Sequence, residues 1–246
     1  AQAQPVDMLE RASELFRSIS VASLCEADLA NSGLNYPTTS ATASTPSQTS
    51  PEELMKKTSS AKIGEVSAFL SHCWRDEDNS PGMKFAALRT WASRVEEMEG
   101  SGPTIWLDKA CIDQTRIKES LRCLPVFLAG CKGLLAIAGQ EYTTRLWCVM
   151  EIFTFIQMGG RQASIQVVPI GSEDHTLNHV LAGFATFSGE KARCAEKDDE
   201  HRLLAVIEAS FGDFVHFNET VRHVLDERRH LSITMATLPK IEEVHL

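Results

Sequence analysis

The sequence lacks several features that would assign it to a well-defined class of protein. It contains no apolar run of the roughly 18 residues that a membrane-spanning helix needs, and we find no internal repeat. The patterns GxxxxGKS/T and GxSxG do not occur, so a P-loop nucleotide hydrolase and a serine hydrolase have no support. Basic residues are fewer than acidic ones, 24 against 33, and the net charge of −9 disfavours nucleic acid as the main partner. We expect a protein that neither spans a membrane nor binds nucleic acid.

The cysteines also lack a recognisable framework. The seven form no CxxC pair, and several lie inside apolar runs, where a free cysteine behaves as a small hydrophobe. An odd number without a pattern indicates an intracellular, reducing compartment. Because the chain begins at Ala1 without a methionine, we expect that something precedes it in the native protein, which leaves organelle targeting open.

Changes in composition along the chain predict four segments. Apolar residues near helical spacing predict one amphipathic helix over residues 5–30, within an N-terminal segment 1–30, whose apolar face needs a partner. Residues 31–62 are rich in Ser and Thr and carry three prolines, which is typical of a linker. An α/β domain is expected over 63–230, followed by a tail over 231–246.

Four short apolar segments predict the strands of that domain, at residues 66–71, 104–107, 134–138 and 165–170. Helical periodicity lies between them, and Pro125 must kink or divide the helix expected over 115–130. Strands that alternate with helices predict an open parallel sheet of four to five strands with right-handed crossovers. After Gly171 the pattern predicts extra C-terminal helices over 173–187, 197–211 and 213–229.

The most informative stretch runs from the third predicted strand into the helix that follows it. The helix contains Trp147 and Glu151, which are four residues apart and therefore share one face. In open α/β sheets, ligands bind outside the carboxyl ends of the strands, where this helix begins. An indole and a carboxylate side by side at that place are a candidate site.

Three segments in this order resemble the boxes of a Toll/interleukin receptor (TIR) domain. They are AFLSHCWRDE (68–77), TIWLDKACIDQ (104–114) and AGQEYTTRLWCVMEI (138–152). In the third, Tyr142, Trp147, Cys148 and Glu151 fall at the family's spacing, whereas Leu146 stands where many relatives carry Arg, Ser or Lys. The resemblance implies a flavodoxin-like sheet, assembly through domain contacts and, in some members, cleavage of NAD⁺ at the nicotinamide–ribose bond. It also implies that Glu151 is the essential catalytic carboxylate and that Trp147 lines the nicotinamide pocket.

The chemistry of that reaction suits a single carboxylate. Cleavage of an N-glycosidic bond passes through an oxocarbenium-like state, which a nearby negative charge stabilises. Nicotinamide leaves a cationic pyridinium as a neutral molecule, so no general acid is required, and an indole can stack on the departing ring. We predict Ser71, His72 and Asp108 near the ribose and phosphates. We expect no metal and no cofactor, with NAD⁺ as the possible substrate.

The same residues have plainer interpretations. Glu151 fits a carboxylate that the helix dipole favours near an N-terminus, and Trp147 fits a packed core aromatic. The acidic residues 76–78 fit a solvated loop, and Ser71 and His72 fit the polar end of a strand. The sequence therefore leaves two functions open, which are an NAD⁺ glycohydrolase and a non-catalytic module for self-association or assembly.

Overall fold

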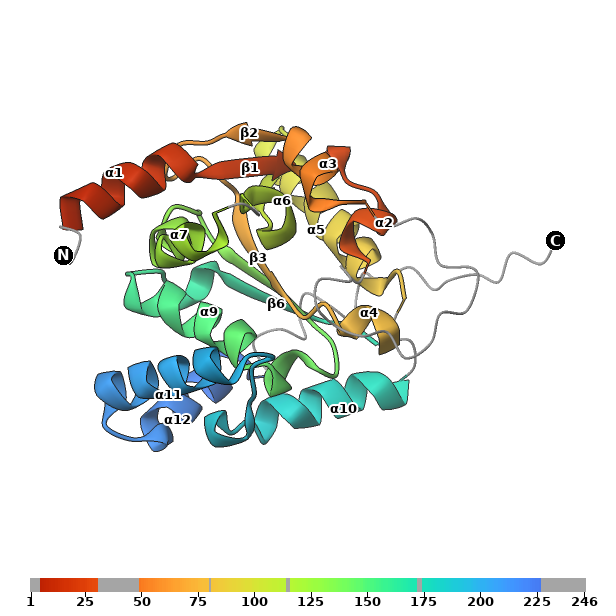
Figure 1. The fold of residues 1–246 in the computed structure, drawn as a ribbon. Helices are drawn as coiled ribbons and strands as arrows, with labels where there is room; N and C mark the ends of the chain where they lie inside the picture. Colours follow the sequence, from red (N-terminus) through yellow and green to blue (C-terminus); the bar gives the residue numbers. More distant parts are fainter. Residues whose placement is uncertain (1–4, 31–48, 80, 114–115, 172–173, 227–246) are drawn as a thin grey trace.

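The computed structural model describes residues 5–30, 49–79, 81–113, 116–171 and 174–226. Six strands form one sheet in the order β2-β1-β4-β3-β5-β6, with helices packed around it (Figure 1). The four predicted strands are all present, as β3 (Ala68–His72), β4 (Thr104–Trp106), β5 (Leu134–Ala138) and β6 (Ile165–Pro169). They pair in parallel, and their order along the sheet, second-first-third-fourth, is that of a flavodoxin-like sheet. The predicted α/β class with an open parallel sheet is confirmed.

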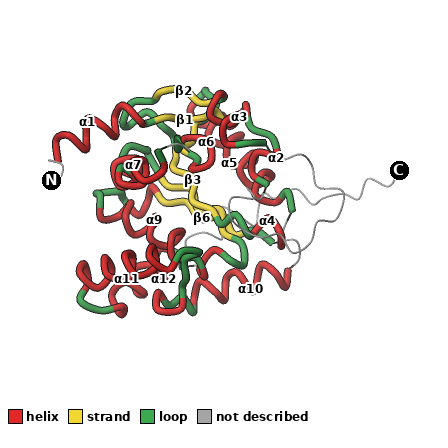
Figure 2. Tube along the Cα trace, viewed as in Figure 1, coloured by secondary structure: helices red, strands yellow, loops and turns green. Residues whose placement is uncertain are grey.

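The central strands are buried because helices cover both of their faces. Every residue of β3 and β5 is buried, which explains their nearly continuous apolar sequences. The register places Leu70, Leu135 and Gln166 in one row, and Trp91 of α5 (Met83–Glu99) donates from its Nε1 to Gln166 at 2.8 Å. Ser71 belongs to the next row, which faces α9 (Leu146–Gln157) on the opposite side of the sheet. Figure 2 shows β3 and β6 in the middle of the molecule with helices on both sides, and the first two strands of the chain at its upper edge.

Helices complete the two outer layers. Pro125 divides the helix expected over 115–130 into two helices, as the sequence predicts. The C-terminal helices pack against the outer side of α9, where the ring centroids of Phe153 and Phe217 are 5.7 Å apart. The remaining helices are α4 (Asp76–Asn79), α6 (Asp108–Cys111), α7 (Ile117–Arg122), α8 (Leu124–Ala129), α10 (Asp174–Ala185), α11 (Lys197–Phe211) and α12 (Phe214–Val224). Short 3₁₀ turns occur at Tyr142–Thr144, Gln162–Ser164 and Gly189–Lys191. The last predicted helix ends at Val224, and the predicted tail lies outside the described residues.

The single helix predicted over residues 5–30 is wrong. The helix α1 (Pro5–Leu15) ends before β1 (Arg17–Ser20), which is followed by a 3₁₀ turn (Val21–Ser23) and α2 (Glu26–Leu29). Strand β1 adds to the edge of the parallel sheet, antiparallel to β4, with Ile19 opposite Ile105. Strand β4 offers backbone hydrogen-bond partners to β1, and in this arrangement Phe16 and Ile19 are buried, each 1% exposed. The pairing and the burial together override the helical spacing of the apolar residues.

The linker predicted over 31–62 is also wrong for the part that the structure describes, and residues 31–48 lie outside it. Residues 49–62 contain α3 (Pro51–Lys56) and β2 (Thr58–Ser60), which pairs antiparallel with β1. A capping box starts α3, because the Ser50 hydroxyl accepts from the amide of Glu53 and the Glu53 carboxylate accepts from the amide of Ser50. Both N-terminal strands therefore belong to the same sheet, and the expected domain boundary at residue 63 does not exist. Within the described ranges, no helix has both the length and the apolar character to cross a membrane.

Candidate functional site

A cavity of about 250 Å³ lies beside the carboxyl ends of β3 and β4, against the start of α9. Its position agrees with the rule that open α/β sheets bind ligands outside the carboxyl ends of their strands. Its wall contains three indoles, from Trp74, Trp106 and Trp147, and three carboxyl groups, from Asp108, Glu151 and Asp199. Arg75 and Arg145 also line it, together with His72, Cys73, Cys148, Ile112, Leu121 and Leu124.

Glu151 and Trp147 both line this cavity, so the shared helix face predicted from their spacing is directed at it. Trp147 is half-buried, because part of its ring packs against the hydrophobic core while part faces the cavity. The hydroxyl of Ser71 donates a hydrogen bond to Oε2 of Glu151 at 2.6 Å. Among the described residues, no basic side chain forms an ion pair with Glu151. The carboxyl group is therefore held by a neutral donor.

This environment changes the acidity of Glu151. Burial raises the pKa of Glu151 well above its usual value, and the negative charge of Asp108 acts in the same direction. The hydrogen bond from Ser71 lowers it only in part. Glu151 thus favours its protonated form until a positive charge comes close to it.

Ser71 lies behind Glu151 and does not line the cavity. It is fully buried, and its Oγ is 2.7 Å from the hydroxyl of Tyr142, which also donates to the carbonyl of Cys148 at 3.4 Å. The structure thus places Ser71 behind the Glu151 carboxyl group, which it helps to orient, and outside the cavity wall. Tyr142, part of the third box, completes this short chain of hydroxyl groups.

His72 and Asp108 meet across the ends of β3 and β4. The Asp108 carboxylate accepts from the amide of Lys109 at 2.6 Å and from the indole of Trp74 at 3.1 Å, and its Oδ1 lies 3.9 Å from His72 Nε2. The His72 ring contacts Trp74 edge-on, with 4.2 Å between centroids. Burial lowers the pKa of His72, so its imidazole favours the neutral form. Burial alone would raise the pKa of Asp108, but His72 and the hydrogen bonds bring it below the usual value.

Sequence reasoning missed the residues that fix the loop after β3. Asp76, expected in a solvated loop, is fully buried and accepts from the amides of Gly139 at 2.9 Å and Glu141 at 2.7 Å. This carboxylate ties the end of β3 to the end of β5. Polar composition gave the wrong prediction because the partners of Asp76 are backbone amides more than 60 residues away.

Lys84 supports the same loop from α5. It is 1% exposed and donates to the carbonyls of Cys73 and Trp74, each at 3.2 Å, and it lies 3.6 Å from the Glu77 carboxylate. Burial lowers the pKa of Lys84. Because these bonds set the path of the backbone after His72, they decide where the cavity wall stands.

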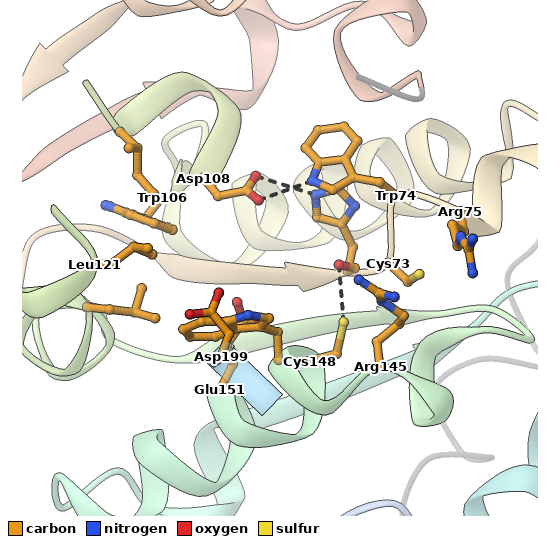
Figure 3. Close-up of a pocket in the computed structure, with 14 residues that line it drawn as sticks. Cys73, Trp74, Arg75, Trp106, Asp108, Leu121, Arg145, Cys148, Glu151 and Asp199 are labelled. Carbon is orange, nitrogen blue, oxygen red and sulfur yellow. Dashed lines mark hydrogen bonds and ion pairs between the residues drawn. The ribbon is translucent and has the colours of Figure 1, made fainter. Parts of the chain in front are cut away.

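The charges that line the cavity are separated in space. Figure 3 shows Arg75 and Arg145 at one end, while Glu151 and Asp199 lie toward the other, with Asp108 above them. The sequence did not single out either arginine or Asp199. Their shared place depends on three distant segments, which are the β3 loop, the start of α9 and the start of α11.

Comparison of the chain with models of protein families, with curated proteins and with solved structures gave no match. The TIR resemblance therefore rests on the three sequence segments alone. Within the part of the chain that the structure describes, no group of three or more His, Cys, Asp or Glu side chains is arranged to hold a metal ion.

Proposed function

We propose that this protein cleaves the nicotinamide–ribose bond of NAD⁺, with Glu151 as the carboxylate that stabilises the developing cation. The observation that carries the proposal is a half-buried carboxyl group facing a cavity beside an indole, without a basic side chain paired to it among the described residues. A cationic aromatic ring is the ligand such a wall attracts, because the indole faces and the carboxyl groups both favour positive charge. The three segments that resemble a TIR domain support the same reaction.

The raised pKa of Glu151 fits this role. A nicotinamide cation beside the carboxyl group favours its ionised form, so binding would release the proton. The carboxylate then faces the anomeric carbon as the C1′–N bond breaks and positive charge moves onto the ribose. Trp147 would stack on nicotinamide as it leaves.

The size and charge of the cavity fit one end of a dinucleotide. Its volume of about 250 Å³ is slightly below the ~300 Å³ at which ligand pockets usually begin, so the nicotinamide riboside end would be enclosed while the rest lies outside. Arg75 and Arg145, at the opposite end from Glu151, suit the pyrophosphate, because guanidinium groups bind phosphate oxygens through paired donors.

The test is to incubate concentrated purified protein with NAD⁺ and to assay for nicotinamide. Glu151→Gln keeps the shape of the side chain and removes the charge, so we expect nicotinamide release to fall roughly 100- to 1000-fold, about 3–4 kcal/mol. Glu97→Gln makes the same change on the exposed face of α5 and should leave the rate unchanged. The proposal is wrong if wild-type protein releases no nicotinamide, or if Glu151→Gln releases it at the wild-type rate.

One observation favours assembly as a second function. The first helix presents Met8 and Leu9, which are 36% and 54% exposed, beside α7, whose Ile117 is 42% exposed. Arg11 joins the two helices through an ion pair with Glu119. We infer that this apolar surface contacts a second copy of the chain. Light scattering of wild-type protein and of Leu9→Asp at high micromolar concentration tests this, and a wild-type monomer would exclude it.

A further inference from the structure

The imidazole of His72 is buried and polar, yet neither ring nitrogen forms a hydrogen bond with the described residues. Its side chain is 3% exposed and lines the cavity, and within the described part of the chain neither Nδ1 nor Nε2 has a hydrogen-bond partner. Leaving such a group unpaired costs about 1–3 kcal/mol, so a native structure that keeps one usually has a functional use for it. We expect the missing hydrogen-bond partner of His72 to enter through the cavity.

The surroundings of His72 determine what it can offer to that group. Asp108 lies 3.9 Å from Nε2 and is itself held by the Trp74 indole and the Lys109 amide, so it would attract a proton on Nε2. With the proton there, Nδ1 is left as an acceptor, because a neutral imidazole has one donor and one acceptor nitrogen. Burial and the positive charges of Lys84 and Lys109 lower the pKa of His72 and keep the ring neutral. A neutral imidazole oriented by a carboxylate is the usual form of a general base.

We propose that His72 is the base for the water that completes the cleavage of NAD⁺, with Asp108 as the residue that positions it; this rests on the function proposed above. The C1′–N bond breaks and its electron pair leaves with nicotinamide. The water oxygen bonds to C1′ in the same step, as positive charge builds on the ribose, and the surplus proton passes to Nδ1 and on to solvent. The products are ADP-ribose, nicotinamide and one proton. Glu151 stabilises the cation and His72 acts on the nucleophile, so the two residues serve different halves of the reaction.

This division of labour can be tested with a nucleophile that has no proton to lose. Water must give up a proton when it attacks C1′, whereas the ring nitrogen of a pyridine does not. A neutral pyridine such as 3-acetylpyridine can therefore replace water without a base, and its product is the corresponding dinucleotide. A defect in the base should be bypassed by this reagent, and a defect in cation stabilisation should not.

The experiment measures nicotinamide release by His72→Gln with and without 3-acetylpyridine. Glutamine can still hydrogen-bond a hydroxyl group but is a poor base, so we expect release in buffer to fall about 100-fold, the lower end for general-base catalysis. Release should recover toward the wild-type rate when 3-acetylpyridine is added, with the exchanged dinucleotide as product. Glu151→Gln should be slow under both conditions.

Each result decides the role of His72. A slow His72→Gln protein that 3-acetylpyridine does not restore would show that His72 only binds substrate, and a variant at the wild-type rate would show that no base is needed there. If His72→Gln does not fold, as judged by thermal unfolding, Asp108→Asn decides, because the Asp108 side chain is 43% exposed and its replacement is better tolerated. Asp108→Asn should show a smaller defect with the same recovery, and the absence of recovery would overturn the proposal. Failure of the proposed function is separate, because wild-type protein would then release no nicotinamide.

Discussion

Two carboxyl groups lie beside the carboxyl ends of neighbouring strands, Asp76 fully buried and Glu151 half-buried, and they differ in what surrounds them. Asp76 accepts from two backbone amides and closes the gap between the ends of β3 and β5. Glu151 has one hydroxyl donor and faces a cavity. Burial raises the pKa of both, to about 6 for Asp76 and well above the usual value for Glu151. A buried acid with complete hydrogen bonding stabilises the fold, whereas a half-buried acid that is partly unsatisfied beside a cavity is available for chemistry.

The largest effect on stability is expected from Asp76→Ala. Removing the carboxylate leaves the amides of Gly139 and Glu141 buried without an acceptor, so we expect a loss of about 3 kcal/mol in the free energy of unfolding. Denaturant unfolding measures it, and Asp198→Ala at an exposed position should change stability by less than about 0.5 kcal/mol.

The loss should depend on pH in a defined direction. The pKa of Asp76 is raised from 3.8 to about 6 by burial, so its contribution to stability is greatest below pH 3.8 and declines as the pH rises to 6. The difference between wild type and Asp76→Ala should shrink over this window. A difference that grows with pH would mean that Asp76 is stabilised as an anion.

Gly139→Ala tests the same junction from the other side. An added Cβ would lie 2.4 Å from Cγ of Asp76, which must move and lose its alignment with the amides. We expect a loss of about 2 kcal/mol, in the range of overpacked sites. Gly102→Ala meets no atom within 4 Å and should change stability by about 0.5 kcal/mol or less. Equal effects of the two substitutions would contradict the importance of this contact.

Ser71→Ala probes the support behind Glu151. It removes the donor that lowers the pKa of Glu151, so that pKa should rise further and the activity should need a higher pH. The loss in stability should be about 1 kcal/mol, a typical value for one hydrogen bond. The rate of nicotinamide release as a function of pH tests the shift, and the exposed Ser59→Ala is the control. An unshifted profile with a lower rate would show that Ser71 does not set the acidity of Glu151.

Glu151→Gln should have the smallest effect on stability, and in the opposite direction from Asp76→Ala. Because the folded-state pKa of Glu151 is raised, the wild-type fold loses stability as the pH rises above the ordinary value of 4.5. The variant does not titrate, so its stability should be within about 0.5 kcal/mol of wild type near pH 5 and increasingly favourable above it. Thermal unfolding across pH measures this. A variant that is less stable at every pH would place Glu151 with Asp76 among the structural residues.

The amino-acid sequence by itself determined the parallel part of the sheet and one face of the candidate site. Four apolar runs bounded by polar loops specify β3 to β6, because a strand covered on both sides, as β3 and β5 are, must be apolar throughout. The spacing of Trp147 and Glu151 specifies a shared helix face, since that follows from 3.6 residues per turn. These properties are local, and a local pattern is sufficient to encode them.

Only the tertiary structure decided which distant strands pair and which distant groups lie against the polar side chains. Strands β1 and β2 form because the edge beside β4 offers backbone hydrogen bonds, which the helical spacing of residues 5–30 does not reveal. Asp76 is buried because the amides after β5 need an acceptor, and His72 meets Asp108 because β3 and β4 are neighbours in the sheet. Periodicity fixes which face of an element is apolar, but it carries no information about which distant group will lie against a polar side chain.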